Sequence, residues 1–457
     1  MKPSLPQGTR DFSAGVLRKR NYILQTIRSV FELYGFEPLE TPAMENMDTL
    51  MGKYGEEGDK LIFKILNNGL HLPEKKSAAE QDFQSVLEGK TNKGITERAL
   101  RYDLTIPFAR YVSMNHGQLA MPFKRYQIQP VWRADRPQKG RYREFWQCDA
   151  DIAGSNSLLH ETELVLIYAT AFHQLAVPVT IHVNNRKILT GLSVLCGGED
   201  RMMDITIAID KLDKIGLDKV KDELIGKGLS MEQIEHVEQF LSIQGDPESC
   251  IRELESIFAT VPVAMEGLKE LKYVYDSTRT YLPKEIEFCI DPSLARGLNY
   301  YTGTILEVKA KSVQMGSIGG GGRYDDLTGL FGLKGVAGIG ISFGVDRIYD
   351  VMEELNAFPQ HIHQGTSILF FNTGEFELQT ILLLAHQLRS AGIGCEIFHE
   401  SAKFDKQFKY AEKKSIQKVI IVGTEEIKKK TAIVKDLSSG IQQEIPQTEL
   451  VKSIQLS

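Results

Sequence analysis

The chain has 457 residues, of which 42% are hydrophobic and 25% charged, and its formal net charge is -6. This length predicts two or three domains with cores of their own, and the acidic balance excludes a uniformly basic nucleic-acid binder. The five cysteines form no CxxC pair, which argues against disulfides and zinc and favours a reducing cytoplasm. The N-terminus lacks the apolar core of a signal peptide, and no run approaches the roughly 18 apolar residues of a membrane span. We therefore expect a cytoplasmic protein without a membrane segment.

The first hundred residues predict a helix followed by extended segments. Apolar residues at helical spacing indicate a helix from about 14 to 34, which Gly35 ends as a C-terminal cap. Pro38 and Pro42 confine the next stretch to an edge or interface strand. A short strand is expected over 61–66 and an irregular polar loop over 71–94. The stretch 98–112 should begin as a strand and enter a helix near Pro107.

The stretch 123–154 predicts a strand, a long basic loop and a second strand. Period-two spacing puts polar residues on one face of each strand. These residues are Arg125, Gln127, Gln129 and Arg133 in the first strand, and Arg143, Gln147, Asp149 and Asp151 in the second, beside the aromatic Phe145. The opposite face of the second strand carries Tyr142, Trp146, Cys148 and Ile152, which predicts packing.

The polar face predicts a ligand site. Each polar group buried there without a partner would cost roughly 2–7 kcal/mol. The loop 133–143 alone fits a solvated hairpin tip equally well, and Phe145 alone fits a packing residue. The aligned Arg, Gln and Asp residues favour binding of a polar ligand, with arginine suited to phosphate.

The remaining chain predicts a helix over 158–175, a strand over 179–183, a helical insertion over 187–280 and a strand over 286–290. A Gly-rich turn over 316–327, an apolar strand over 335–343 and a helix over 346–355 should follow. After a linker at 356–366, strands and helices alternate, which predicts a small α/β domain with a parallel-type sheet.

Several isolated features have ordinary readings. The glycine run 316–323 matches neither a P-loop nor a dinucleotide fingerprint, and favours tight turns and close backbone approach to a ligand or a neighbouring strand. Arg296 alone reads as a surface residue, Arg347 as a local salt-bridge partner, and Asp103 as a strand-end cap. His361 and His363 lack a third ligand, so we expect no metal site. No spacing assembles a catalytic triad.

Three stretches together resemble the three class motifs of class II aminoacyl-tRNA synthetases: GFEPLETPAMEN (35–46), the central stretch 123–154, and GIGISFGVDRI (338–348). RGLNYYTG (296–303) is similar to a histidine-specific signature, and GGRYD (321–325) accompanies it. Over nearly its whole length the chain thus resembles the histidyl-tRNA synthetase family.

That resemblance implies an α+β fold, with an antiparallel catalytic sheet flanked by helices. It implies catalytic parts at 1–186 and 283–355, a helical insertion at 187–282, a linker at 356–366, and an α/β anticodon-binding domain at 367–457. It also implies a homodimer built partly on the first motif.

The implied reaction is ATP-dependent activation of L-histidine to histidyl-adenylate, followed by transfer to the 3′ end of histidine tRNA. Mg²⁺ accompanies ATP, and no organic cofactor is implied. The family pattern makes Arg133 and Arg296 catalytic. ATP binding falls to Arg133, Asp135, Arg141, Phe145 and Arg347. Histidine binding falls to Asp103, Thr105, Arg133, Gln147, Asp151, Arg296, Tyr300 and Tyr301. Contact with the tRNA acceptor end falls to Gln138, Lys139, Arg141 and Arg143.

Many bacterial relatives carry Glu where this chain has Asp103 and Asp151, whereas the eukaryotic-like branch carries Asp. The shorter side chains leave the partner of each carboxylate open. Two rivals share part of the pattern: the regulatory subunit of ATP phosphoribosyltransferase, and an RNA-binding module without catalysis. The retained Arg133, Arg296 and Arg347, together with residues 367–457, argue against both.

Overall fold

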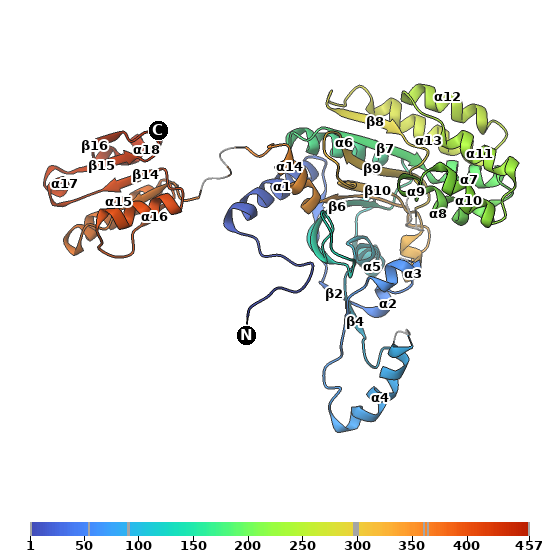
Figure 1. Cartoon of the computed structure of the whole chain (residues 1–457), viewed down its shortest axis with the longest axis horizontal. Helices are drawn as coiled ribbons and strands as arrows, with labels where there is room; N and C mark the ends of the chain where they lie inside the picture. The colour runs from blue at the N-terminus through green and yellow to red at the C-terminus, as the bar shows by residue number, and fades with distance from the viewer. Residues whose placement is uncertain are drawn as a thin grey trace. The chain divides into compact units, whose positions relative to one another are not determined.

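The computed structural model describes residues 2–53, 55–88, 92–295, 301–359, 362 and 365–455. The chain divides into two compact units, one made of residues 1–12 and 20–358 and the other of residues 13–19 and 359–457. Figure 1 shows the helices and strands of both. The division between the units near residue 358 lies close to the linker that the sequence indicates.

An eight-stranded sheet organises the first unit, in the order β1-β5-β6-β11-β10-β9-β7-β8. The β1–β5 and β7–β8 pairs are parallel, and the other neighbouring pairs are antiparallel. The expected antiparallel catalytic sheet is thus confirmed. Its strands are β1 (Glu37–Pro38), β5 (Phe123–Trp132), β6 (Glu144–Ala153), β7 (Val179–Asn185), β8 (Ile286–Ile290), β9 (Thr304–Ala310), β10 (Gly319–Arg323) and β11 (Gly338–Gly344).

Helices bury one face of this sheet. Phe31 of α1 (Ala14–Leu33) contacts Tyr126 of β5 and Phe343 of β11, with ring centroids 5.7 Å apart in both pairs. Tyr168 and Phe172 of α6 (Leu159–Gln174) pack on the same Phe343. Burial of these aromatic rings stabilises the layer through apolar area and ring geometry. The polar faces of β5 and β6 point to the other side of the sheet.

The predicted insertion consists of helices joined by turns, with no strand among its described residues. In it Gly191 allows two helices, α7 and α13, to cross closely, because a Cβ there would lie only 2.4 Å from the Ala264 Cβ. The helices are α7 (Arg186–Leu195), α8 (Met202–Ile209), α9 (Leu212–Ile215), α10 (Leu217–Gly226), α11 (Met231–Leu241), α12 (Pro247–Ile257) and α13 (Pro262–Thr278).

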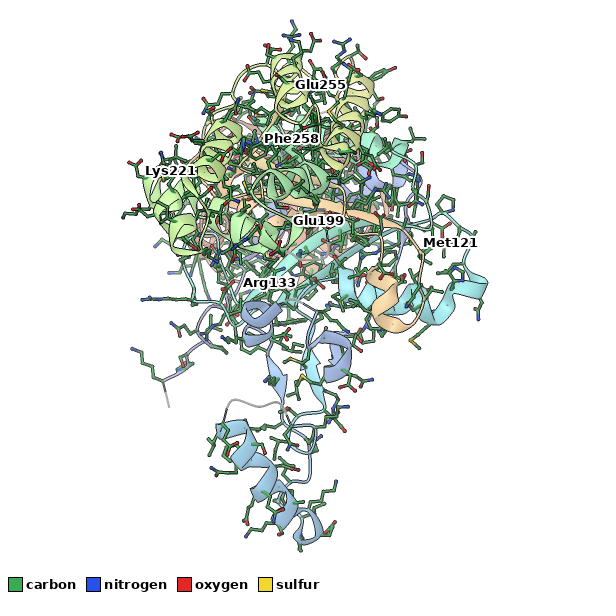
Figure 2. The ribbon with its side chains drawn as sticks, turned by 90° about the vertical axis from the view of Figure 1, so that its right-hand side faces the viewer. Met121, Arg133, Glu199, Lys221, Glu255 and Phe258 are labelled. Carbon is green, nitrogen blue, oxygen red and sulfur yellow. The ribbon has the colours of Figure 1, made fainter. Side chains whose placement is uncertain are left out.

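The segment 71–94, expected to be an irregular loop, contains a helix instead. In the chain it follows β2 (Met44–Asn46), α2 (Met47–Leu50), α3 (Gly55–Lys60) and β3 (Lys64–Ile65), and it precedes β4 (Arg98–Leu100), which pairs with β2 and β3 in a small sheet. The helix α4 (Pro73–Leu87) projects from the body of the unit, as Figures 1 and 2 show, and buries none of its side chains. Because no side of this helix packs on a core, its sequence shows no periodic spacing of apolar residues, and the helix was missed. The residues that favour it are Pro73 in the first turn and the helix formers Ala, Glu and Gln.

The glycine run also differs from its prediction in part. Gly319–Arg323 is the extended strand β10, and none of its glycines has a positive φ. A Cβ at Gly321 would lie 2.1 Å from the Gly340 carbonyl oxygen on β11. The prediction of a turn was therefore wrong, whereas close approach to a neighbouring strand is confirmed.

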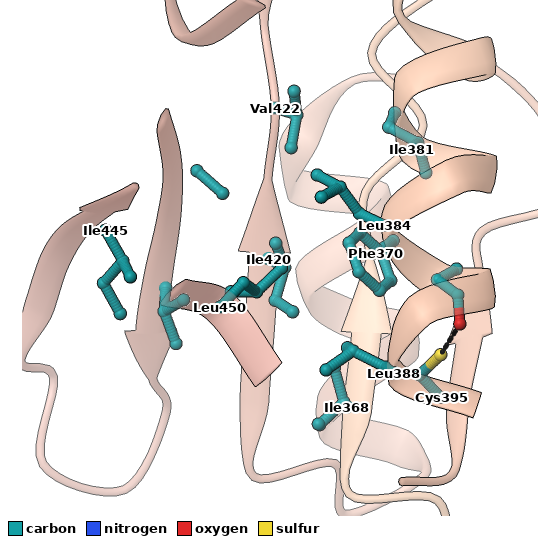
Figure 3. Packing of buried hydrophobic residues seen from close by; sticks show 13 residues of the cluster. Ile368, Phe370, Ile381, Leu384, Leu388, Cys395, Ile420, Val422, Ile445 and Leu450 are labelled. Carbon is teal, nitrogen blue, oxygen red and sulfur yellow. Dashed lines mark hydrogen bonds between the residues drawn. The ribbon is translucent and has the colours of Figure 1, made fainter. Parts of the chain in front are cut away.

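The second unit has a five-stranded sheet in the order β13-β12-β14-β15-β16. β12 pairs in parallel with β13 and β14, but β15 and β16 add antiparallel pairs, so the sheet is mixed and not simply parallel. Figure 3 shows Phe370, Leu384 and Ile420 in its buried core. The elements are β12 (Ile368–Phe370), α15 (Glu375–Ser390), β13 (Cys395–Ile397), α16 (Phe404–Lys413), β14 (Lys418–Ile421), α17 (Thr424–Lys429), β15 (Thr431–Asp436), β16 (Gln442–Pro446) and α18 (Leu450–Gln455). Across the described ranges, no helix has the length and apolar character that a membrane crossing requires.

Candidate active site

A cavity of about 830 Å³ lies over the polar face of the large sheet. Its floor comes from β6, β9, β10 and β11, and its rim from the β5–β6 loop and the start of α5 (Thr105–Asn115). The antiparallel register sets Arg125 opposite Asp151, Gln127 opposite Asp149, and Gln129 opposite Gln147. The period-two prediction is thus confirmed, because the odd-numbered residues of both strands share one face.

Twelve of the fifteen residues predicted for substrates line this cavity. They are Asp103, Thr105, Arg133, Asp135, Gln138, Lys139, Arg141, Phe145, Gln147, Asp151, Tyr301 and Arg347. Arg143 does not line it, because its Nε donates to the Asp135 carbonyl oxygen at 3.2 Å. Arg296 and Tyr300 lie outside the described residues, as do His361 and His363.

Arg133 is held at the cavity by its backbone and its side chain. Its backbone N–H donates to the Arg143 carbonyl across the hairpin at 2.9 Å, and its Nε donates to the Tyr102 carbonyl at 3.1 Å. The guanidinium lies over the rings of Tyr102 and Phe145, 4.2 and 5.1 Å from their centroids. A guanidinium fixed in this way has its planar fork pre-oriented for an anion.

A second cationic group lies at the other end of the hairpin loop. Arg347, on α14 (Val345–Glu354), donates from Nε to the Gly140 carbonyl and from Nη1 to the Ser317 carbonyl, both at 2.7 Å. Arg141 Nη1 lies 3.7 Å from Asp135 Oδ1, and Lys139 is an exposed cation at the loop tip. These cationic groups surround a space in which their guanidinium and ammonium groups could bind a polyanion.

The structure supplies the partners of the two carboxylates that the sequence left open. Asp103 Oδ1 accepts from the Ile106 backbone N–H at 3.1 Å, at the start of α5. Asp151 Oδ1 accepts from the Tyr324 hydroxyl, and Arg125 Nη2 lies 2.9 Å from Asp151 Oδ2. Burial raises the pKa of Asp151, and the charge of Arg125 and the Tyr324 hydrogen bond oppose that rise.

The site contains a third carboxylate, Asp149, that was not among the predicted site residues. It lies between Gln147 and Asp151 on the same face, and only 2% of it is exposed. Burial and the charge of Asp151 raise its pKa from 3.8 to about 7. The signal that could have identified it was the alternation of the strand, which already put Asp149 on the polar face.

The N-terminal segment was also missed as part of the site's support. Arg10 and Arg20 both pair with Asp346 of α14, whose Oδ2 accepts from the Trp146 backbone N–H at 3.2 Å. Arg10 also stacks 3.3 Å from the ring centroid of Tyr142. Tyr142, predicted to be packing, therefore lines the cavity and holds the loop through a cation–π contact.

Comparison with known proteins supplies the family. A family model described as histidyl-tRNA synthetase matches residues 79–348, and one described as anticodon binding domain matches residues 368–456. A histidine–tRNA ligase from Bacteroides fragilis is 50% identical over 454 residues, covering 99% of each chain. One from Porphyromonas gingivalis is 50% identical over 448 residues, covering 97% of each chain.

Solved structures agree with these sequence relatives. The crystal structure of a histidyl-tRNA synthetase from a Nostoc species superposes with a TM-score of 0.82 at 31% identity, over 100% of this chain and 99% of that chain. A Bacillus halodurans protein, described as an ATP phosphoribosyltransferase regulatory subunit/histidyl-tRNA synthetase, has a TM-score of 0.73 at 19% identity and so shares the fold alone. The chain therefore belongs to the histidyl-tRNA synthetase family, which its sequence motifs already resembled.

Proposed function

We propose that this chain activates L-histidine with ATP and transfers the histidyl group to the 3′ end of histidine tRNA. The observation that carries the proposal is one cavity that joins a pre-oriented arginine, a second arginine at its far end, and a floor of buried carboxylates. Such a site is suited to a substrate with a carboxylate and cationic nitrogens, bound beside a nucleoside triphosphate. The full-length similarity to histidine–tRNA ligases supports the same reaction.

In the first step, a carboxylate oxygen of histidine attacks the α-phosphorus of ATP, and the bond to the bridging oxygen of pyrophosphate breaks. Two anions meet, so positive charge must stabilise the five-coordinate phosphorus. Arg133 supplies that charge, because its position between Tyr102 and Phe145 is already fixed before substrate arrives. Arg296 adds a second cation on the carboxylate side; this role rests on the RGLNYYTG signature.

ATP would bind as its Mg²⁺ complex, in which the metal would neutralise part of the phosphate charge. Phe145 stacks on the adenine, and Asp135 accepts from its amino group. Arg347 and Arg141 hold the γ-phosphate. Support for this orientation comes from the cavity itself, in which Phe145 and Arg133 lie at one hairpin base and Arg347 contacts the loop at Gly140.

Histidine occupies the floor between β6 and the start of α5. Asp103, Thr105, Gln147 and Asp151 bind its nitrogens, with Tyr301 and Tyr300 at the imidazole side. Asp151 is held in place by Arg125 and Tyr324 before the substrate binds. A carboxylate fixed in this way loses little entropy on binding, which favours affinity and specificity.

The third substrate, tRNA, contacts the loop that carries Gln138, Lys139, Arg141 and Arg143. The anticodon contacts fall to 367–457. The catalytic parts are 1–186 and 283–355, with a helical insertion at 187–282 and a linker at 356–366.

The active form is a cytoplasmic homodimer. Native mass measurement of the purified protein tests the dimer.

A histidine-sensing regulatory subunit is the alternative. Such a subunit binds histidine but needs neither a complete set of phosphate-binding arginines nor an anticodon domain. Here Arg133 and Arg347 both line the cavity, and the anticodon-domain model matches 368–456.

The experiment that separates the two is aminoacylation. Purified protein is incubated with ATP, Mg²⁺, labelled histidine and a transcript of histidine tRNA, and acid-precipitable label is counted. The proposed function predicts charging that depends on both ATP and the cognate transcript. Histidine binding without charging would support the regulatory alternative.

A further inference from the structure

The buried carboxylates that line the cavity include Asp103, Asp149, Asp151 and Glu307 of β9, and Asp103 and Asp151 each accept a hydrogen bond from the protein. Asp103 receives the Ile106 backbone N–H, and Asp151 receives the Tyr324 hydroxyl and faces Arg125. Asp149 Oδ1 and Asp151 Oδ2 are both buried without a hydrogen-bond donor among the residues the structure describes, but Arg125 Nη2 lies 2.9 Å from Asp151 Oδ2. Asp149 interacts with Ser342, and its Oδ1 is left without a donor. A buried acceptor without a donor is costly unless a ligand supplies one.

The neighbours of Asp149 present a second acceptor in the same place. Gln147 Nε2 donates to the Ser342 hydroxyl at 2.8 Å, and Ser342 in turn hydrogen-bonds Asp149 from the neighbouring strand β11. This chain of hydrogen bonds uses the amide nitrogen of Gln147. Its Oε1 is buried, and it too has no donor within the described ranges. Two acceptors at one wall of a cavity fit a nitrogen with several N–H bonds.

We propose that Asp149 is a further specificity-determining residue, whose Oδ1 accepts a hydrogen bond from a protonated nitrogen of the bound amino acid. This inference rests on the proposed function, because it takes the amino acid to be histidine. The recognised group is an N–H cation, either the α-ammonium or the imidazole. Asp149 thereby makes the floor electrically complementary to a substrate whose carboxylate is directed to Arg133.

The charge balance of the floor supports this role. With Asp149 and Asp151 both ionised, the fully buried Arg125 of β5 lies opposite Asp151, whereas the neutral Gln127 lies opposite Asp149. Glu307 of β9 is a further buried carboxylate that lines the same cavity. A cationic ligand would neutralise the excess, which favours ionised Asp149 in the complex. The ionisable groups that act on Asp149 are Asp151, Arg125 and Asp103, and those that its own charge affects are Arg101, Cys148 and Tyr168.

Protonation then links histidine binding to pH. Burial, with the charge of Asp151, raises the pKa of Asp149 to about 7 in the free protein. Below that pH the carboxyl carries a proton and resembles the amide of asparagine. Asp149 should therefore contribute fully to histidine binding above pH 7 and progressively less as the pH falls to 6.

The test measures histidine-dependent ATP–pyrophosphate exchange with the wild-type protein and Asp149→Asn. At pH 8 the variant should raise KM for histidine roughly 10- to 100-fold, as expected for loss of one charge-assisted hydrogen bond, with KM for ATP within about twofold. The ratio of wild-type to variant kcat/KM for histidine should shrink as pH falls from 8 to 6. Taking this ratio cancels the titration of free histidine itself. Glu144→Gln, which removes an exposed charge at the outer end of the same strand, is the matched control.

Inhibition by imidazole-4-propionate, which lacks the amine, identifies the nitrogen. If the variant weakens both this compound and histidine, Asp149 contacts the ring; if it weakens histidine alone, Asp149 contacts the ammonium. Should Asp149→Asn fail to fold, Ser342→Ala provides the second test. It removes a hydrogen bond that stabilises the charged form of Asp149, so it should move the midpoint of the pH dependence upward.

An unchanged KM for histidine in Asp149→Asn, or a wild-type-to-variant ratio that stays constant with pH, would overturn the inference. Absence of any histidine-dependent exchange in the wild-type protein would instead refute the proposed function.

Discussion

Replacing Gly340 with alanine puts a methyl group against the floor of the cavity. The new Cβ would lie 2.0 Å from Oδ1 and 2.5 Å from Cγ of Asp151, whereas such contacts essentially never fall below 3.0 Å. Asp151 must therefore move by about 1 Å to reach that limit. That movement separates the carboxylate from the Tyr324 hydroxyl and from Arg125, whose Nη2 now lies 2.9 Å away.

The expected cost has two parts. Complete loss of one partner from a buried ion pair costs about 3–5 kcal/mol, so displacement of Asp151 should cost a sizeable part of that in stability. Histidine loses one charge-assisted hydrogen bond of about 1.5–3 kcal/mol, which corresponds to a roughly 10- to 150-fold higher KM. KM for ATP should change little, because Arg347, which we propose binds the phosphates, is held by the Gly140 carbonyl and not by Asp151.

Exchange kinetics at saturating ATP and urea denaturation measure the two parts separately. Gly226→Ala is the control, since a Cβ there meets nothing within 4 Å at the end of a helix. This control should keep KM for histidine and be neutral or slightly more stable. If Gly340→Ala left KM for histidine within about twofold and the free energy of unfolding unchanged, the assignment of Asp151 to histidine would be refuted.

Three further predictions test other parts of the molecule. Arg296→His should abolish adenylate formation while circular dichroism and native mass stay unchanged; near-normal exchange would disprove its role. Ending the chain after Gly365 should reduce tRNA charging far more than histidine exchange, and equal losses would contradict the anticodon assignment. Because burial raises the pKa of Asp149 from 3.8 to about 7, the folded free protein retains a proton that the unfolded chain releases. The free energy of unfolding should therefore fall as pH rises from about 4 to 7, and less so in Asp149→Asn, as measured by urea denaturation at several pH values.

The central hairpin could be predicted from the sequence because both of its strands show the same alternation of side chains with a period of two residues. Odd positions carry polar side chains, even positions of the second strand carry packing residues such as Cys148 and Ile152, and the loop between is basic. The strands β5 and β6 pair in the register that this alternation requires. Local pattern was sufficient for the register, but not for the surroundings of both strands. Gln147, Asp149 and Asp151 of β6 line the cavity, whereas the polar residues of β5 bind other parts of the protein: Arg125 donates to the Leu104 carbonyl, Gln127 donates to the Thr41 hydroxyl, and Gln129 accepts from Arg101.

Other features depend on tertiary contacts that no local pattern encodes. Asp149, Asp151 and Asp103 look equivalent in sequence, and only the neighbouring strands decide that Arg125 and Tyr324 engage Asp151. The helix α4 was missed because it buries none of its side chains, so no apolar period marks it. The ion pair between Arg10 and Asp346 joins residues more than three hundred positions apart, so residue spacing in the sequence could not predict it.

ATP–pyrophosphate exchange across the standard amino acids tests the central claim most directly. Purified full-length protein is assayed with each amino acid in turn, with Mg²⁺, ATP and labelled pyrophosphate. The arrangement of Arg133, Gln147 and Asp151 in one cavity predicts exchange with histidine and background rates with the others. Exchange with another amino acid, or none with histidine in folded protein, would contradict the account.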